Sequence, residues 1–160
     1  MPQSFSIVPV HSDTHLAHVA ALFDAYAASL DIDLSYQDYG AERAGLPGKY
    51  APPSGALLLA LDAAGAPLGC VAVRGLSLSA CEMKRLYVAP AGRGLGLGRA
   101  LAEAAVEAAR TAGCNELRLD TLPSMAAAIA LYEAMGFVRI PPYYDGAPDG
   151  TIFLTKTLKP

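Results

Sequence analysis

The chain has 160 residues, of which 53% are hydrophobic and 17% are charged, and its formal net charge is −3. This length is typical of one domain, and the composition is too apolar for a disordered segment, so we expect a single domain over residues 1–160. An acidic balance gives no overall basic footprint for nucleic acid. The uncharged stretches are shorter than the ~20 residues of a membrane-spanning helix, so we expect no membrane segment.

The cysteines and the first ten residues predict the compartment. The N-terminus lacks the basic start and long apolar core of a secretion signal. Cys70, Cys81 and Cys114 are odd in number, have no CxxC spacing and lie in apolar surroundings. We therefore expect a cytoplasmic protein with reduced, buried thiols and no disulfide scaffold, and no cysteine has a neighbouring histidine that would favour a nucleophile.

The first half of the chain predicts a strand, a helix and then a run of strands. His11-Ser12-Asp13 stands directly before a helical apolar pattern and offers helix-capping residues. Residues 31–54 are irregular and indicate a short helix and a loop. Three consecutive strands joined by short turns follow, which favours antiparallel pairing. The strands are expected over residues 5–10, 56–61, 68–76 and 80–88.

The second half alternates helices and strands. We expect a long amphipathic helix over about 96–112, ended by Gly113, and a second helix over 124–135 that Ser124 caps and Gly136 closes. Strands are expected over residues 114–121, 137–140 and 151–158. The resulting order, β-α-α-β-β-β-α-β-α-β-β, predicts a mixed sheet with helices on its faces.

A glycine-rich segment, residues 88–99, connects a strand to the start of the long helix. Glycines allow backbone N–H groups to approach a ligand, and a helix N-terminus adds unpaired donors and partial positive charge, which suits phosphate. The segment has no lysine for a P-loop, and neither Gly92 nor Gly94 begins a GxGxxG fingerprint. The alternative interpretation is an ordinary tight turn into a helix.

Two motifs resemble those of the GNAT superfamily of N-acetyltransferases. Arg93-Gly-Leu-Gly-Leu-Gly98 is similar to its Arg/Gln-x-x-Gly-x-Gly/Ala signature, and residues 128–137 resemble its A-x-x-L-Y-x-x-x-G-F segment. The resemblance implies an α/β fold with a central, mostly antiparallel twisted sheet flanked by helices. It also implies an acetyl-CoA-dependent N-acetyltransferase.

The same resemblance assigns cofactor contacts. The strand end, splayed from its neighbour by a bulge, would bind the pantetheine arm and offer an N–H near Val88 to the oxyanion. The glycine-rich amides would hold the pyrophosphate. Many relatives have asparagine where Met125 stands, so a polar contact to the pantetheine or adenosine side is either missing here or supplied by Ser124. The expected cofactor-binding residues are Leu86, Tyr87, Val88, Arg93, Gly94, Leu95, Gly96, Leu97, Gly98, Arg99 and Ser124.

Two residues are candidates for catalysis. Glu82 resembles in position the strand glutamate that some family members use as general base, directly or through water; its alternative role is a salt bridge with Lys84, Arg85 or a neighbouring strand. Tyr132 matches the tyrosine of the second motif, which protonates the CoA thiolate; its alternative role is a core tyrosine. A base is useful because an amine near pKa 10.4 is about three units above neutral pH.

The acceptor is expected to be a primary amine of a small or amino-acid-like molecule. Acidic and aromatic residues of the early helices and the last strand pair would receive it by charge and cation–π contact; they are Asp31, Asp33, Asp38, Glu42, Tyr143, Tyr144 and Asp145. A protein lysine or N-terminus, a CoA-binding regulatory module without turnover, and an interaction protein remain alternatives. An edge strand at the C-terminus leaves a homodimer open. His11, His15 and His18 match no zinc spacing, so no metal is expected.

Overall fold

The computed structural model describes residues 5–30 and 38–158. Seven strands form one sheet in the order β1-β2-β3-β4-β5-β7-β6. Every neighbouring pair is antiparallel except β4 and β5, which run parallel. The strands and main helices are β1 (Phe5–Pro9), α1 (Asp13–Ser29), α2 (Tyr39–Ala44), β2 (Ala56–Asp62), β3 (Pro67–Gly75), β4 (Ala80–Val88), α3 (Leu97–Thr111), β5 (Glu116–Thr121), α4 (Ala126–Ala134), β6 (Val138–Ile140) and β7 (Ile152–Thr157). Short 3₁₀ turns stand at Gly48–Tyr50 and Pro90–Gly92.

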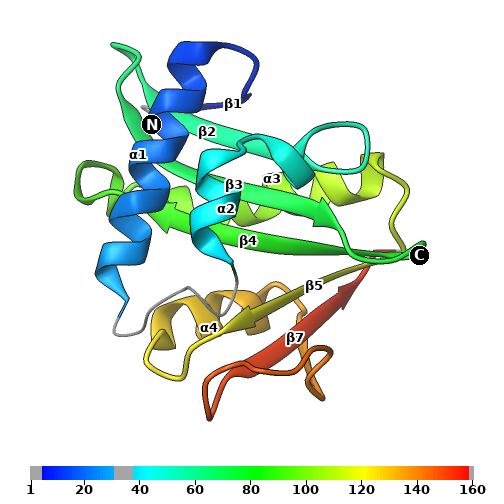
Figure 1. Cartoon of the computed structure of the whole chain (residues 1–160). Coiled ribbons are helices and arrows are strands. Elements are labelled where there is room, and N and C mark those ends of the chain that lie inside the picture. The colour runs from blue at the N-terminus through cyan, green and yellow to red at the C-terminus, as the bar shows by residue number, and fades with distance from the viewer. Residues whose placement is uncertain (1–4, 31–37, 159–160) are drawn as a thin grey trace.

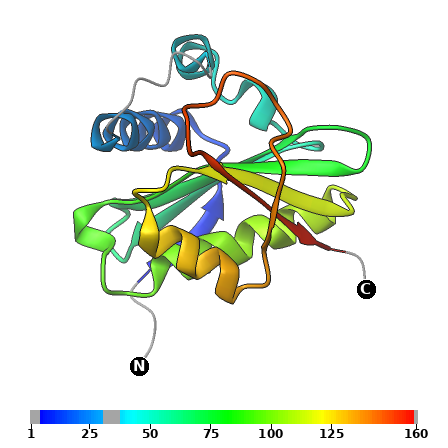
Figure 2. The ribbon, with the colours of Figure 1, turned by 90° about the horizontal axis from the view of Figure 1, so that it is seen from below.

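Helices cover both faces of the sheet. Figures 1 and 2 show α1 and α2 on one side of it and α3 and α4 on the other. The α3 side holds the larger apolar core, in which Leu101 and Ala105 of the helix pack against Leu117 and other strand residues. The α1 side holds a smaller core around Phe23 and the fully buried Tyr50. The predicted mixed sheet, its mostly antiparallel pairing and the helices on its faces are confirmed.

The parallel pair β4 and β5 stays together for only three residues. Its register runs from Ala80 opposite Glu116 to Glu82 opposite Arg118, after which the strands diverge (Figure 1). On the other edge of β4, the register with β3 shifts between Cys70 and Ala72, and Arg85 has a φ of 60°. This is the extra residue of a β-bulge, which bends a strand and increases its twist. The predicted bulge is therefore confirmed, and it lies just before Leu86.

Most predicted elements are confirmed, with two corrections. Ser12 caps α1 by accepting the His15 N–H at 3.1 Å, as expected. Ser124, in contrast, caps nothing: α4 begins after Met125, and no side chain caps it. The sheet edge near the C-terminus is the three-residue β6, while the last strand β7 pairs on both sides. None of the helices in the described ranges is long and apolar enough to cross a membrane.

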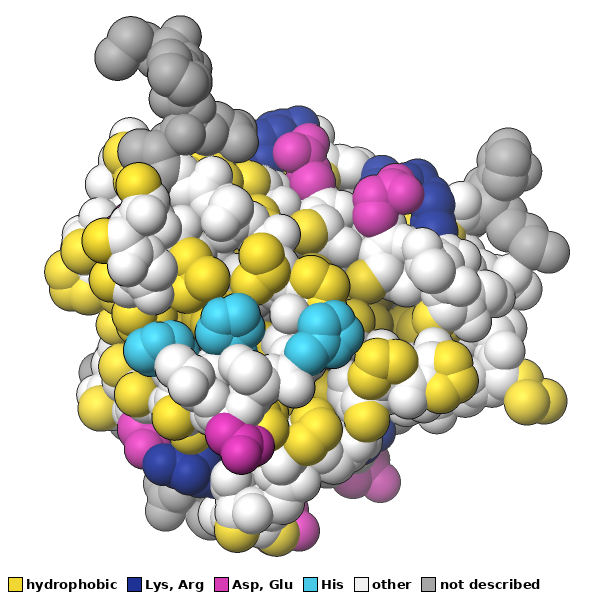
Figure 3. All heavy atoms as spheres, turned by 90° about the horizontal axis from the view of Figure 1, so that it is seen from above, with side chains coloured by type: hydrophobic (Ala, Val, Ile, Leu, Met, Phe, Trp, Pro, Cys, Tyr) yellow, Lys and Arg dark blue, Asp and Glu magenta, His cyan; other side chains and the backbone are white. Residues whose placement is uncertain are grey.

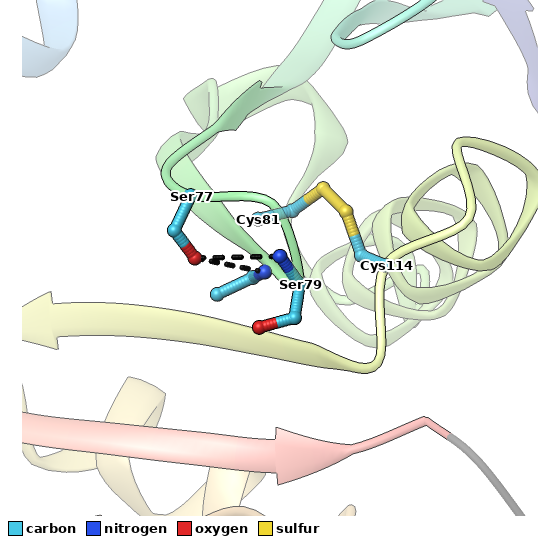
Figure 4. Close-up of a disulfide and its surroundings, with 5 residues drawn as sticks. Ser77, Ser79, Cys81 and Cys114 are labelled. Carbon is cyan, nitrogen blue, oxygen red and sulfur yellow. Dashed lines mark hydrogen bonds between the residues drawn. A yellow bond between two sulfur atoms is a disulfide. The ribbon is translucent and has the colours of Figure 1, made fainter.

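A disulfide corrects the expectation for two of the three cysteines. Cys81 at the start of β4 is bonded to Cys114, which precedes β5, with 6.0 Å between their Cα atoms (Figure 4). Both residues lie at the end where the two strands are paired, so the bond holds that end closed. Sequence spacing missed it because the pair forms only when the helix between them returns the chain to β4. Cys70 is a free, buried thiol. The cytoplasmic location remains a prediction, and the cysteine pattern no longer supports it.

Candidate functional site

A cleft opens where β4 and β5 diverge. It has a volume of about 570 Å³, open space at its mouth included. Met83 and Leu86 of β4 and Leu119 and Asp120 of β5 form its walls, and Tyr132 of α4 closes one side. The end of α1 contributes Tyr26 and Leu30, and the remaining lining residues are Lys84, Arg85, Thr121, Leu122, Met125 and Thr151. Where two strands separate, their backbone N–H and C=O groups are free to bind a ligand, whereas in a continuous sheet they would bond to the neighbouring strand.

The glycine-rich segment lies at the start of α3, beside the end of β4. Gly94 and Gly96 have φ values of 83° and 74°, which only glycine adopts without strain, and a Cβ at either one would meet nothing within 4 Å. A Cβ at Gly98 would lie 4.0 Å from Val88, the last residue of β4. The first-turn N–H groups of an α-helix have no partner within the helix. The segment therefore presents open backbone donors next to the cleft, as an anion site requires.

Tyr132 lies on α4 and is 6% exposed at the wall of the cleft. Its ring packs against Phe137 with centroids 5.7 Å apart, and its hydroxyl has no hydrogen bond within the described part of the chain. Burial, with smaller contributions from Tyr26 and Asp120, raises the pKa of Tyr132 well above its ordinary value of 10. The side chain is therefore a neutral phenol near pH 7, the form that can donate a proton.

Glu82 is the last residue of β4 that pairs with β5, and it is 1% exposed. Its Oε1 accepts from Arg74 Nε at 2.8 Å and lies 3.9 Å from Lys84 Nζ, while Oε2 accepts from the Tyr143 hydroxyl at 2.6 Å. It is not among the residues that line the cleft. The salt-bridge alternative for Glu82 thus has direct support, and any role as base requires a water path to the cleft.

The loop between β6 and β7 brings two consecutive tyrosines onto the sheet. Tyr143 and Tyr144 both pack edge-on against Phe153 of β7, with centroid distances of 5.1 and 5.3 Å. The Tyr143 hydroxyl donates to Glu82, and the Tyr144 hydroxyl donates to Asp120 of β5. Figure 2 shows this loop passing over the sheet on the side of α1 and α2. The loop therefore contacts two carboxylates on the neighbouring strands that form the cleft.

Comparisons with known proteins agree with this geometry. Residues 19–137 match the model of the Acetyltransferase (GNAT) family. The chain belongs to the GNAT acetyltransferase family. An uncharacterized N-acetyltransferase of Schizosaccharomyces pombe is 36% identical over 154 residues, covering 96% of this chain and 94% of that protein. The predicted family and the predicted enzyme class, an N-acetyltransferase, are confirmed.

Solved structures share the GNAT fold. An acetyltransferase from Streptococcus agalactiae superposes with a TM-score of 0.79 at 25% identity, covering 98% of this chain and 99% of that one. The Salmonella typhimurium protein yncA, solved with its cofactor acetyl-CoA, has a TM-score of 0.70 at 20% identity, covering 98% of this chain and 95% of that one. GNAT acetyltransferases take acetyl-CoA, and the described residues hold no group of three or more His, Cys, Asp or Glu side chains suited to a metal ion.

The remaining cofactor candidates of this GNAT protein lie in two places. Arg93 folds back so that its Nε donates to the Val88 carbonyl at 3.3 Å. Leu95 and Arg99 are exposed, and Arg99 pairs with Glu103 at 3.4 Å. Ser124 is exposed in the turn before α4, while its neighbour Met125 lines the cleft. The position that departs from the family pattern thus does face the site.

The predicted acceptor residues divide into four groups, of which the last is the tyrosine pair Tyr143 and Tyr144. Asp31 and Asp33 lie outside the described residues. Asp38 and Asp145 are exposed. Glu42 is bonded to Arg85 at 2.9 and 3.0 Å, so this pair neutralises itself.

Tyr143 and Tyr144 are not among the residues that line the cleft, but Tyr144 donates to Asp120, which does line it and which sequence reasoning missed. Asp120 lies in an alternating strand like many surface aspartates, so no local signal separates it. Its partner Tyr144 is 24 residues away in sequence.

The histidines and the free cysteine are not part of the cleft. Figure 3 shows the three histidines side by side on one surface of the molecule, near the start of α1. Burial raises the pKa of the Cys70 thiol above its ordinary value of 9.0. A buried thiol of this kind is unreactive, which favours direct transfer over a covalent acetyl-cysteine.

Proposed function

We propose that this GNAT protein transfers the acetyl group of acetyl-CoA directly to a primary amine of a small molecule or amino-acid-like acceptor. The observation that carries the proposal is the continuity of the site: open backbone donors at the start of α3 adjoin a gap between β4 and β5, and a buried phenol borders that gap. Anion binding, strand-edge pairing and proton donation are the three tasks that acetyl-CoA and its leaving thiolate require.

The residues present fit acetyl-CoA. Backbone amides from Arg93 to Arg99 would hold the pyrophosphate: Leu95 lies between the two open glycines, and Leu97 and Gly98 begin α3. The strand end from Leu86 through Tyr87 to Val88 would bind the pantetheine arm, and the exposed Ser124 would contact it from the other side. When bound, the thioester supplies the activated acetyl group.

Tyr132 is proposed as the general acid. Its raised pKa keeps the proton on the phenol at neutral pH, and its place at the wall of the cleft allows donation to a sulfur in the gap. Glu82 remains the base predicted from sequence. Because it does not line the cleft, it could take a proton from the amine only through water. The acceptor enters from the α1 side, where Lys84, Arg85 and Asp120 line the cleft.

A second candidate is a CoA-binding regulatory module without turnover. The ion pairs of Glu82 favour it, because a base committed to Arg74 and Lys84 is not available to an amine. This candidate predicts cofactor binding without thiol release.

Calorimetric titration with acetyl-CoA, followed by thiol release over a panel of amines and amino acids, tests both candidates. Saturable binding with release for one amine class is expected. Binding without release over the whole panel would favour the regulatory module, and no binding by folded protein would contradict both.

A further inference from the structure

We propose that Asp120 is the carboxylate that receives the acceptor amine and takes its proton, and that Tyr144 is its positioning residue. The inference rests on the proposed function and names a residue that the sequence did not single out. It transfers the role of base from the buried β4 carboxylate to one that borders the cleft.

Asp120 lies where the strands have already separated. The last residue of β5 that pairs with β4 is Arg118, so Asp120 stands two positions further into the divergence. Side chains alternate along a strand, and Leu119 belongs to the core on the α3 side. Asp120 therefore projects to the opposite face, toward α1, while still lining the cleft that Tyr132 borders. The proposed base Asp120 and the proposed acid Tyr132 therefore line the cleft from opposite faces of the sheet.

The charges around the two carboxylates differ. Both oxygens of Glu82 have partners, Arg74 on one and Tyr143 on the other, and the side chain is 1% exposed. Asp120 lines the cleft, which Glu82 does not, and it accepts a hydrogen bond from the neutral Tyr144 hydroxyl. A cationic amine that enters the cleft therefore contacts the Asp120 carboxylate at the cleft wall.

Tyr144 has a defined part in this arrangement. Its ring is held against Phe153 and against Tyr143, so the hydroxyl is fixed over β5. A hydrogen bond donated to a carboxylate favours the ionised form, which is the form that accepts a proton. Tyr143 has the same stacking and donates to Glu82 instead. The two tyrosines therefore form a matched pair for an experiment.

The transfer balances as follows. The acceptor ammonium gives one proton to Asp120, and the nitrogen lone pair then forms a C–N bond with the acetyl carbon. The C–S bond breaks, its electrons remain on sulfur, and sulfur takes a proton from Tyr132. The nitrogen of the adduct loses its second proton to solvent, Asp120 releases its own proton to solvent, and Tyr132 regains one from solvent. The net products are the amide, CoA thiol and one proton.

The first experiment is the pH dependence of kcat/KM for the amine in Tyr144→Phe and Tyr143→Phe. Among the described residues, the groups around Asp120 include Lys84 from β4, Tyr132 from α4 and the two loop tyrosines, with Arg118 beside it on β5 and Tyr26 on α1. A carboxylate that loses a hydrogen-bond donor is harder to ionise, so we expect the acid limb of the profile to move to higher pH in Tyr144→Phe. Tyr143→Phe should leave that limb in place. The reverse pattern would assign the base to Glu82 and overturn the proposal.

The second experiment uses Asp120→Asn with two amines, one of pKa near 10 and one mostly neutral at pH 7. A missing base should lower kcat/KM for the first by about 100-fold and for the second by much less, with the Kd of acetyl-CoA unchanged. Equal losses for both amines, or no loss, would contradict the role of Asp120. Wild-type protein that releases no thiol with any amine would instead count against the proposed function itself.

Discussion

The two sides of the cleft are built from different chemistry. On the α3 side, the polar groups are backbone amides at a helix start, and the side chains around them are apolar. On the α1 side, the polar groups are side chains joined in ion pairs and hydrogen bonds, among them Glu82 with Arg74 and Glu42 with Arg85. Backbone donors suit a cofactor that is the same for a whole family, whereas side chains can change with the acceptor.

The charged side should respond most strongly in stability. In Glu82→Gln, Arg74 and Lys84 lose their buried counter-charge, so we expect the free energy of unfolding to fall by about 3 kcal/mol. Urea unfolding followed by circular dichroism measures this. Glu116→Gln is the matched control, since its partner Arg118 is partly exposed and the pair should contribute less than about 1 kcal/mol. Equal, small losses in both variants would mean that the Glu82 ion pairs are not structural.

The backbone side should respond most strongly in cofactor affinity. Gly96→Asp puts a side chain at a positive φ and a negative charge where the pyrophosphate is proposed to bind. We expect acetyl-CoA affinity to fall by about 100-fold, or ~2.7 kcal/mol, by calorimetry. Gly65→Asp is the control, because Gly65 also has a positive φ of 84° and open space but lies in the β2–β3 turn. An unchanged Kd in Gly96→Asp would remove the anion-site assignment.

Tyr132→Phe tests where the two sides meet. We expect kcat to fall by at least about tenfold, because the variant lacks the proton donor. The Kd of acetyl-CoA should be unchanged, because the substitution removes no hydrogen bond within the described part of the chain. The raised pKa of Tyr132 also predicts that this residue causes no alkaline limb below pH 10. Tyr39→Phe, which removes a hydroxyl bonded to Asp24 outside the cleft, should keep wild-type turnover. A Tyr132→Phe enzyme with the wild-type kcat and pH profile would refute the acid role.

The smallest expected effect is the titration of Glu42. Burial opposes ionisation, but two hydrogen bonds and the charge of Arg85 outweigh it, so the pKa of Glu42 lies below its usual value of 4.5. Its stabilising contribution is therefore complete above pH 4.5 and is lost as the pH falls through the lower folded-state pKa. Carbon NMR of the Glu42 carboxyl should give a midpoint below 4.5. A midpoint at or above that value would show that Arg85 does not stabilise the charge.

The contrast between the two sides also explains what could be predicted from the sequence. The cofactor side depends on short-range features. Gly94 and Gly96 directly precede α3, and Tyr132 lies six residues after the start of α4. Motif and periodicity therefore suffice to locate these residues. The order of helices and strands along the chain was predicted for the same reason, whereas the bulge before Leu86 was implied by the family resemblance. Ser124 failed as a cap because Met125, rather than the capping residue, precedes the first helical turn.

The acceptor side depends on contacts between distant segments. Tyr143 meets Glu82 across 61 residues, and Cys81 meets Cys114 across 33. No local sequence pattern predicts such a contact, because it depends on how the strands are arranged in the sheet. Asp120 in particular differs from a surface aspartate only through its position in the divergence of β4 and β5.

The disulfide gives this chain an uneven response to mechanical force. Cys81 and Cys114 enclose the end of β4, the glycine-rich segment and all of α3 in one covalent ring. A molecule pulled by its two ends can extend only the segments outside that ring. With a sequence separation of 33 between the cysteines, the oxidised chain should reach a contour length roughly 110 Å shorter than the reduced chain, at about 3.4 Å per residue. The glycine-rich segment and α3 would then bear no extension at all.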